Sequence, residues 1–273
     1  MKFLLIAYYF GNASDVGAQR WNKNIKYIQK LGWEPVVFSF NQENENKFEV
    51  ISNKKIEPNT LYQSLFKKKV PSDILTRKKI NFWNKLLVFI RSNFFIPDSR
   101  MFWIKKSFKY LDKYLMENKV DAIISTGPPH SSHLIAYKLF RKHRITWLSD
   151  FRDPWTSMDY LKKMNLKKFA IKKHERLERL IIENSSKVIV VGKTMQNEFK
   201  QKYNIDSEII YNGYSSENEI NNNQLLDEKF SIVHTGSFLH NRNCEDLWSV
   251  LSNLVHSDKE FSKKLEIKLI GNV

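Results

Sequence analysis

The chain has 273 residues, 42% of them hydrophobic and 14% aromatic, which supports one large or two ordinary domains with a packed core and excludes a disordered protein. The formal net charge of +16, from 45 basic and 29 acidic side chains, favours nucleic acid, an anionic membrane or a phosphorylated ligand, unless it reflects a lysine- and asparagine-rich proteome. The single cysteine, Cys244, excludes an internal disulfide framework. Since no apolar run reaches the roughly 18 residues of a membrane span, we expect a cytoplasmic protein.

The first 40 residues predict a right-handed βαβ unit. Residues 2–10 form an apolar strand, a glycine-containing loop and a helix follow, and 34–40 form a second strand. Gly11 and Gly17 are too far apart for the dinucleotide-binding fingerprint. Gly17 would let a phosphate approach backbone N–H groups near a helix start, and the alternative is an ordinary loop glycine.

The next stretch contains a basic, aromatic-rich segment. Residues 41–76 are polar and show little periodicity, so we expect irregular structure and short helices there. Residues 78–95 alternate aromatic and aliphatic side chains with lysine and arginine. This pattern predicts an amphipathic helix that lies on an anionic bilayer or, alternatively, packs on its own domain with its basic groups in water. Residues 101–116 predict another helix.

Residues 121–155 predict two strand tips that carry polar turns. A short strand at 122–125 should end before Thr126–Pro129, since proline cannot donate to a sheet. Ser131-Ser132 then offers a helix N-cap. A second strand at 145–148 ends in the charged cluster Asp150–Trp155. Ligands of parallel α/β sheets bind outside the carboxyl ends of strands, so we expect both turns to open into one crevice.

The remaining sequence continues the α/β pattern of the first domain and, after a polar stretch, starts a second α/β domain. Helices are expected at 164–183 and 194–203, and strands at 187–191 and 208–211. We predict a Rossmann-like parallel-sheet domain at 1–214, a linker at 215–228 and a second Rossmann-like domain at 229–273. One βα unit, whose strand is expected at 230–235, and one further strand, at 265–270, cannot bury both faces of a sheet. We therefore expect the second domain to be incomplete, or to be completed by another chain.

Elimination leaves one set of candidate site residues. His130 and His133 have no carboxylate or cysteine at metal-ligand spacing, no serine occupies a G-x-S-x-G elbow, and no nucleic-acid-binding motif is present. The residues that remain combine phosphate-compatible turns, a carboxylate able to accept a proton and cations able to balance a leaving phosphate. They are Gly17, His130, His133, Asp150, Arg152, Asp153, Asn212, Gly236 and Arg242.

Several short motifs, taken together and in order, resemble a known family. VGAQRW, IPDSRMFW, IISTGPPHSSHLIA, WLSDFRDPW, VIVVGKTM and IIYNGY are similar to the amino-terminal half of a bacterial family 4 glycosyltransferase. The later segment FSIVHTGSFLHNRNCEDLWSVL resembles the start of that family's nucleotide-sugar domain. The match spans nearly the whole chain, and the pair STGPP and DFRDPW at its spacing is its most specific part.

The resemblance implies a GT-B fold, with an acceptor domain first and a nucleotide-sugar domain second. It implies sugar transfer from a nucleoside diphosphate sugar with retention at the anomeric carbon, without a metal or another cofactor. Gly17 matches a turn that approaches the donor phosphates, and the loop with Gln19 and Arg20 would border the acceptor. Gly236 and Arg242 match the residues that face the diphosphate.

The resemblance leaves the catalytic residues open. Many family members have a histidine where Arg152 and Asp153 stand here. We assign catalysis to Asp153, Arg152 and His133, with a structural Asp–Arg–Asp lock as the alternative. For His130 and His133 the alternative is a pair of helix N-terminal histidines bonded to the backbone. The substrate-binding candidates are Gly17, Gln19, Arg20, His130, Asp150, Asn212, Gly236 and Arg242.

We expect a glycosyltransferase of a pathway that builds surface polysaccharide or glycolipid. Its acceptor would be a glycan or a lipid-linked molecule, reached at the inner face of the cell membrane. The family's Glu-x7-Glu segment for the donor sugar is absent, so we expect these residues alone to be inactive. The alternatives are a non-catalytic acceptor-binding subunit that needs a partner chain, or a basic protein that binds nucleic acid, which we do not expect.

Overall fold

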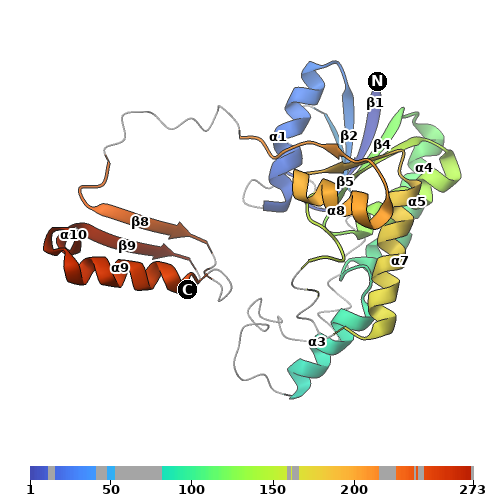
Figure 1. Cartoon of the computed structure of the whole chain (residues 1–273). Coiled ribbons are helices and arrows are strands. Elements are labelled where there is room, and N and C mark those ends of the chain that lie inside the picture. The colour runs from blue at the N-terminus through green and yellow to red at the C-terminus, as the bar shows by residue number, and fades with distance from the viewer. Residues whose placement is uncertain are drawn as a thin grey trace. The chain divides into compact units, whose positions relative to one another are not determined.

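The computed structural model describes residues 1–11, 16–40, 48–52, 82–158, 161, 166–214, 226–236, 238 and 243–271. The described residues form two compact units, the first ending at 214 and the second beginning at 226 (Figure 1). Most of the predicted linker lies outside the described residues, so the domain boundaries stay a prediction.

The larger unit contains a seven-stranded sheet in the order β3-β2-β1-β4-β5-β6-β7, and every pairing is parallel. The chain builds outward from β1 to β3 and then returns to the other side of β1, which makes the β1–β4 boundary a topological switch point. The predicted Rossmann-like α/β fold is confirmed. The strands are β1 (Lys2–Ile6), β2 (Glu34–Ser39), β3 (Glu49–Ser52), β4 (Ala122–Gly127), β5 (Thr146–Phe151), β6 (Lys187–Val190) and β7 (Glu208–Ile209).

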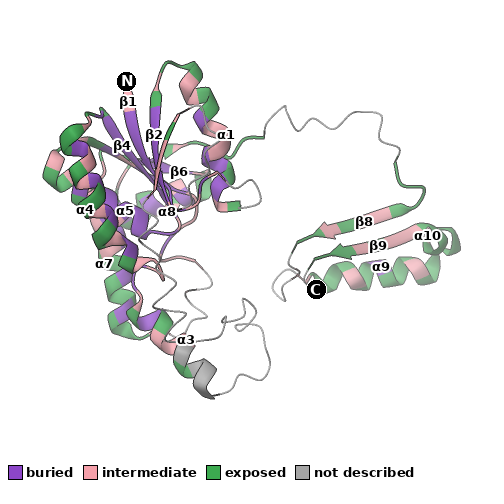
Figure 2. Ribbon diagram, turned by 180° about the vertical axis from the view of Figure 1, so that it is seen from behind, coloured by how far each residue is buried: buried purple, intermediate pink, exposed green. Residues whose placement is uncertain are grey.

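Helices cover both faces of this sheet, which is why its central strands are largely buried (Figure 2). Alternate residues point to opposite faces. Phe3 packs in the cluster that holds Trp21 of α1, and Leu4 packs in the cluster that holds Trp103 of α4 and Ile135 of α5. No helix in the described part of the chain has the length and apolar content needed to cross a bilayer. The helices are α1 (Val16–Lys30), α3 (Phe82–Phe94), α4 (Met101–Glu117), α5 (Ser131–His143), α7 (Lys168–Asn184) and α8 (Lys193–Tyr203).

Two strands run further than the sequence predicted. Thr126 and Gly127 were expected in a turn but belong to β4, where they pair with Asp150 and Phe151 of β5. The prediction was wrong because it extended the effect of Pro128 and Pro129 to the two residues before them, whose own N–H groups can still take part in the sheet. Strand β3 was also missed, since its four residues at the sheet edge are at most partly buried and show no clear apolar alternation.

The cap of α5 is not the one predicted. Ser131 is the first residue of the helix rather than its N-cap, and no side chain at the N-cap position accepts a hydrogen bond. Instead, the Ser131 N–H and hydroxyl both donate to the carboxylate of Asp98, at 2.9 and 2.7 Å. A residue 33 positions earlier therefore supplies the negative group that a helix N-terminus favours.

The smaller unit has one two-stranded parallel sheet with two helices. Strands β8 (Phe230–Thr235) and β9 (Leu265–Ile270) have the predicted bounds, α9 spans Glu245–Ser257, and α10 (Lys259–Lys264) was not predicted. Leu251 is the only buried side chain among the residues described in this unit, and apolar groups such as Phe230 and Val250 are exposed. Figure 2 shows the contrast with the buried strands of the larger unit.

Candidate functional site

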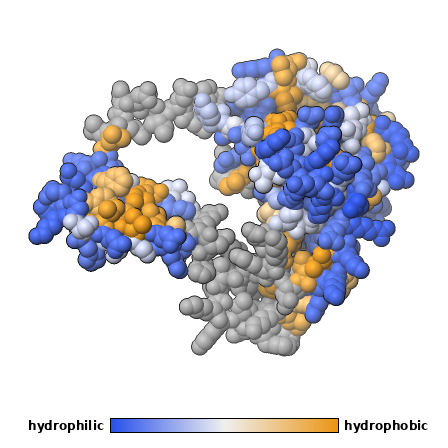
Figure 3. All heavy atoms as spheres, in the orientation of Figure 1, coloured by the Kyte–Doolittle hydropathy of each residue, from blue (hydrophilic) through white to orange (hydrophobic). Residues whose placement is uncertain are grey.

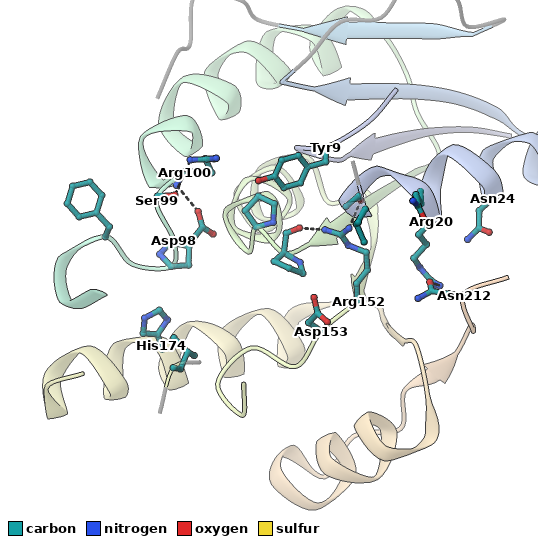
Figure 4. A pocket seen from close by; sticks show the side chains of 18 of the residues that line it. Tyr9, Arg20, Asn24, Asp98, Ser99, Arg100, Arg152, Asp153, His174 and Asn212 are labelled. Carbon is teal, nitrogen blue, oxygen red and sulfur yellow. Dashed lines mark hydrogen bonds between the residues drawn. The ribbon is translucent and has the colours of Figure 1, made fainter. Parts of the chain in front are cut away.

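A cavity of about 670 Å³ lies at the carboxyl end of the larger sheet. Its walls come from the segments that follow β1, β4, β5 and β7, from the first turns of α1, and from the α3–α4 connection (Figure 4). This edge includes the switch point between β1 and β4, where ligands of such sheets bind. The two turns expected to share a crevice both contribute to it, through Pro128 and Pro129 on one side and Arg152 and Asp153 on the other.

Asp150 forms the buried foundation of this site. Its carboxylate is fully buried in β5 and accepts hydrogen bonds from Trp21 Nε1 at 2.9 Å and Thr126 Oγ1 at 2.8 Å. Arg20, only 7% exposed, donates to it through Nε and Nη2, with Nη2 3.0 Å from Oδ1. A buried carboxylate needs this compensation. Asp150 therefore holds Arg20 and does not line the cavity.

Arg20 also links the start of α1 to the segment after β7. Its Nη1 donates to the side-chain oxygen of Asn212 at 2.9 Å and to the carbonyl of Tyr211 at 3.3 Å. Arg20 and Asn212 both line the cavity, as does Gln19. The structure thus brings these three predicted substrate-binding residues together at one end of the cavity.

Arg152 ties three loops together in the middle of the cavity wall. Its guanidinium donates to the carbonyl oxygens of Gly17 and Pro128, and its Nε lies 3.4 Å from the carbonyl oxygen of Gly127. Burial lowers the pKa of Arg152, and the charges of Asp150 and Asp153 oppose that shift. This geometry resembles a lock, but one built on backbone carbonyls rather than on the two aspartates.

Close packing explains why residue 17 is glycine. A Cβ at this position would lie 2.8 Å from a ring carbon of Tyr9 and 3.3 Å from Arg152 Nη1. Carbon atoms do not approach that closely without a shift of the surrounding groups. Gly17 therefore lets the helix start pack against the loop after β1, and its predicted contact with donor phosphate stays a prediction.

Asp153 has a different environment from its neighbour. It lines the cavity, and in the described part of the chain its carboxylate accepts no hydrogen bond and forms no ion pair. Figure 4 shows Asp153 beside Arg152 at the middle of the cavity. A carboxylate without donors is free to accept a proton from a bound hydroxyl group.

The loop that carries Asp153 is fastened by a buried glutamate. Glu178 of α7 accepts hydrogen bonds from the Thr156 N–H at 3.2 Å, from Lys202 at 2.9 Å and from the Tyr203 hydroxyl at 2.5 Å. Burial and the neighbouring carboxylate raise the pKa of Tyr203, which keeps this hydroxyl protonated as a donor. Sequence reasoning did not select Glu178, since nothing in an amphipathic helix distinguishes one buried glutamate from exposed ones.

His130 and His133 lie behind the cavity wall rather than in it. His133 is fully buried, with Nδ1 2.8 Å from Ser125 Oγ and its ring 4.6 Å from that of Phe151. His130 stacks on Trp155 at 4.3 Å. Burial lowers the pKa of His133 to about 3 and that of His130 well below its ordinary value, so both rings are neutral. Neither lines the cavity, which corrects the expectation that these histidines belong to a turn that opens into the crevice. Both rings lie against Gly127 as well as against aromatic side chains.

A third histidine, which sequence reasoning did not select, does line the cavity. His174 of α7 accepts a hydrogen bond at Nδ1 from Trp155 Nε1 at 3.0 Å. Because an indole nitrogen only donates, the proton of the neutral imidazole must sit on Nε2. Burial lowers the pKa of His174 to about 4, against the opposing charge of Glu178. At neutral pH His174 therefore supplies a neutral N–H donor.

The connection between α3 and α4 adds polar residues that were also missed. Asp98 Oδ1 accepts the Arg100 N–H at 2.8 Å, and the Arg100 guanidinium lies over the Tyr8 ring at 4.9 Å. Asp98, Arg100 and Arg91 all line the cavity. These residues belong to or adjoin the motif IPDSRMFW, which was part of the family resemblance, so the motif itself was the available clue.

Comparison with known protein families identifies the family of this chain. The model of Glycosyltransferase Family 4 matches residues 23–218, more than half of the chain. The chain belongs to glycosyltransferase family 4. This family membership implies a nucleotide-sugar donor and an acceptor.

One solved structure agrees at the level of the fold, and a second is reported beside it. Sucrose-phosphate synthase from Thermosynechococcus elongatus aligns over 100% of this chain and 70% of its own, with a TM-score of 0.50 and 11% identity. A glycosyltransferase from Rickettsia africae ESF-5 aligns over 100% and 68%, with a TM-score of 0.45 and 12% identity. A search of curated proteins gives no match.

Six of the residues predicted from sequence to form a site line the cavity of the larger unit. Around one cavity lie Gly17, Gln19, Arg20, Arg152, Asp153 and Asn212. Gly236 follows β8 in the smaller unit with φ +116°, a conformation that favours glycine, and its N–H donates to the Ile270 carbonyl at 2.8 Å. Arg242 lies outside the described residues.

Proposed function

We propose that this glycosyltransferase moves a sugar from a nucleoside diphosphate sugar to a hydroxyl group of an acceptor bound in the cavity of the larger unit. The observation that carries the proposal is the position of Asp153, whose carboxylate accepts no hydrogen bond from a described residue, next to the anchored Arg152 at the switch point of a family 4 sheet. The acceptor side is expected here because this unit holds the first of the two predicted domains.

In the proposed reaction the bond between the anomeric carbon and the diphosphate oxygen breaks, and a bond from the acceptor oxygen forms on the same face of the sugar. The electron pair of the broken bond leaves with the nucleoside diphosphate. The acceptor proton passes to Asp153, for which a carboxylate within hydrogen-bond reach is required. Arg152 keeps its charge near the leaving diphosphate, and His133, through Phe151 and Gly127, positions the loop rather than touching substrate.

The test is a donor titration followed by a transfer assay. Because these residues are expected to be inactive alone, the protein tested carries a complete family 4 donor domain in place of the smaller unit. Calorimetry of this protein with a panel of nucleoside diphosphate hexoses should show saturable binding of one donor. With that donor and a bacterial lipid extract, Asp153→Asn should lower the release of nucleoside diphosphate by about 100-fold, the lower range for loss of general-base catalysis, and leave donor binding unchanged. Glu208→Gln, an exposed acid on β7, is the matched control. Equal rates for Asp153→Asn and wild type would exclude Asp153 as the base.

The same titration separates the alternatives. A non-catalytic acceptor-binding subunit would bind no donor of the panel and release no nucleoside diphosphate. Nucleic-acid binding would appear as retardation of random DNA that falls steeply with salt, and we expect none.

We further propose that the acceptor is lipid-linked and serves surface polysaccharide or glycolipid synthesis. The supporting feature is an aromatic and basic edge next to the cavity. Phe94 and Phe169 are 55% and 51% exposed with ring centroids 5.7 Å apart, and Lys167 lies 5.9 Å from the Phe89 ring. Figure 3 shows hydrophobic side chains gathered where α3 and α7 lie. Exposed aromatic groups beside lysines suit an anionic membrane surface.

Vesicle sedimentation tests this edge. The chain should sediment with vesicles that contain phosphatidylglycerol and less with phosphatidylcholine alone. Phe94→Ser with Phe169→Ser should weaken sedimentation by about 10-fold, the loss expected when two rings no longer enter the interface. Phe230→Ser, an exposed aromatic of the smaller unit, is the control. Unchanged sedimentation of the double variant would remove the membrane proposal and leave sugar transfer untouched.

A further inference from the structure

The cavity is lined by more positive than negative groups. Two carboxylates, Asp98 and Asp153, face five basic side chains, a formal excess of three positive charges. The basic residues are Arg20, Lys23, Arg91, Arg100 and Arg152. A concave, partly desolvated surface with this imbalance concentrates anions.

Two of these cations, Arg20 and Arg152, already bind other groups of the protein. Arg20 is neutralised by the buried Asp150, with Nη2 3.0 Å from Oδ1. The guanidinium of Arg152 donates to the backbone carbonyls of Gly17, Gly127 and Pro128. Most N–H groups of these two side chains are already used in these contacts and in those of Arg20 with Tyr211 and Asn212, so an anion would be bound mainly by the other cations.

The two arginines beside the α3–α4 connection are not committed in this way. Arg100 donates to Ser99 Oγ at 3.0 Å and lies over the Tyr8 ring, and neither contact offsets its charge. The nearest acid, Asp98, accepts hydrogen bonds from Ser131 and from the Arg100 N–H. Within the described ranges, neither Arg91 nor Arg100 forms an ion pair with a carboxylate. The charge of Arg100 opposes the rise in the pKa of Asp98 that burial causes, so Asp98 offsets Arg100 in part. Because neither arginine is ion-paired among the described residues, their side chains still make this end of the cavity cationic.

The same end carries a neutral donor. His174 lines the cavity near Asp98 and Arg100, whereas Arg20, Asn24 and Asn212 lie toward the other end (Figure 4). Its Nδ1 is occupied by the Trp155 indole, which leaves Nε2–H as the available donor. Two guanidinium groups and an N–H match the several oxygens and double charge of a phosphate better than a single carboxylate.

We infer that the acceptor carries a phosphate group, and that Arg91 and Arg100 bind this phosphate at the end of the cavity next to the α3–α4 connection. The inference rests on the proposed role of the cavity as the acceptor site. It adds the chemical class of the acceptor, a phosphomonoester or diphosphate, either water-soluble or attached to a lipid chain.

Paired probes test this with the full chain. Calorimetry compares glucose 6-phosphate with glucose, and geranyl phosphate with geraniol. In at least one pair the phosphorylated member should bind at least about 10-fold more tightly, as charge-assisted hydrogen bonds require. The sugar pair reports a water-soluble acceptor and the geranyl pair a lipid-linked one. The preference should weaken as salt is raised, because the cations are partly exposed to solvent.

Variants locate the phosphate. Arg100→Gln and Arg91→Gln should each reduce binding of the phosphorylated probe by about 10-fold, as loss of one charge-assisted contact predicts, and leave the neutral member unchanged. Arg141→Gln is the matched control, because Arg141 is also an arginine over a tyrosine ring, 5.9 Å from Tyr137, but lies outside the cavity. Circular dichroism establishes that the variants fold. If Arg100→Gln does not fold, Arg91→Gln alone provides the test, because Arg91 is exposed on α3.

The outcomes separate this inference from sugar transfer. A phosphate preference below about 2-fold in both pairs, or one that both arginine variants retain, overturns it, since one lost contact should cost about 10-fold. Displacement of the probe by uridine or guanosine diphosphate also overturns it, because the arginines would then serve the donor. A chain that binds donor but shows no phosphate preference still supports sugar transfer. Phosphate binding that depends on Arg100, without donor binding, supports the phosphate site and counts against transfer.

Discussion

Asp150 carries a charge inside the sheet, and hydrogen bonds from its neighbours offset the cost of burying it. Three side chains from α1 and β4 donate to its carboxylate, and the partner cation Arg20 is itself buried. Such a pair adds little net stability, but the loss of one partner leaves an uncompensated buried charge.

Asp150→Asn should therefore lower the free energy of unfolding by about 3–5 kcal/mol, the range for a broken buried ion pair. Urea denaturation measures this. Glu208→Gln removes the acid of an exposed pair with Lys187 and should cost less than about 1 kcal/mol. Equal losses in the two variants would mean that Arg20 finds other compensation.

His174 makes stability depend on pH. Its pKa in the folded chain is about 4, below the ordinary value of 6.5, because burial disfavours the imidazolium. As the pH falls, His174 is therefore protonated in the unfolded chain before it is protonated in the folded chain. Its contribution to the free energy of unfolding is complete above pH 6.5 and is lost as the pH falls toward 4.

Between pH 7 and pH 5, the unfolding free energy should fall by about 2 kcal/mol through this residue. His174→Asn should remove that part of the slope, measured by urea denaturation at both pH values, and the exposed His256→Asn should not. An unchanged slope in His174→Asn would assign the acid sensitivity to the buried His130 and His133 instead, whose pKa values are also lowered.

At the scale of elements, Asp98 couples two helices and the cavity. Its carboxylate caps α5 through Ser131 and also fixes the Arg100 N–H just before α4. The start of α5 and the proposed phosphate-binding arginine thus depend on the same side chain.

Asp98→Ala should cost about 1–2 kcal/mol, as the loss of a helix cap does, and should increase amide hydrogen exchange at the start of α5. It should also weaken phosphate binding. Asp258→Ala removes a cap of the same kind from α10, where Asp258 accepts from Glu260 and Phe261, and should leave α5 unchanged. Full protection of the α5 amides in Asp98→Ala would show that water replaces the carboxylate.

At the scale of the whole molecule, the two units differ in how much apolar surface they bury. Strands β1 and β4 of the larger unit have no exposed residues, whereas Val233 of β8 and Ile270 of β9 remain exposed. Segments with few buried apolar contacts open locally with low free energy.

Amides of β8 and β9 should therefore exchange faster than those of β1, β4 and β5 in native-state hydrogen exchange followed by mass spectrometry. The difference should persist at low denaturant concentration, where local opening dominates. Equal protection in both sheets would show that the apolar surface of the smaller unit is covered in solution.

Local pattern was enough to predict most strands, the parallel α/β class, the family and the edge of the sheet where the cavity lies. Apolar periodicity and the position of turns are properties of neighbouring residues, so they can be recognised in a single chain. The bounds of β8 and β9 and the two adjoining turns after β4 and β5 are of this kind.

Only the tertiary structure decided which polar groups line the cavity. Asp150 is tolerated inside the sheet because Arg20, 130 residues earlier, compensates its charge, and Asp98 caps a helix that begins 33 residues later. His174 reaches the cavity because α7 packs behind the loop that carries Trp155. The reason is physical: burial and hydrogen bonding depend on distant partners, and the residue type alone does not specify which partner the fold supplies.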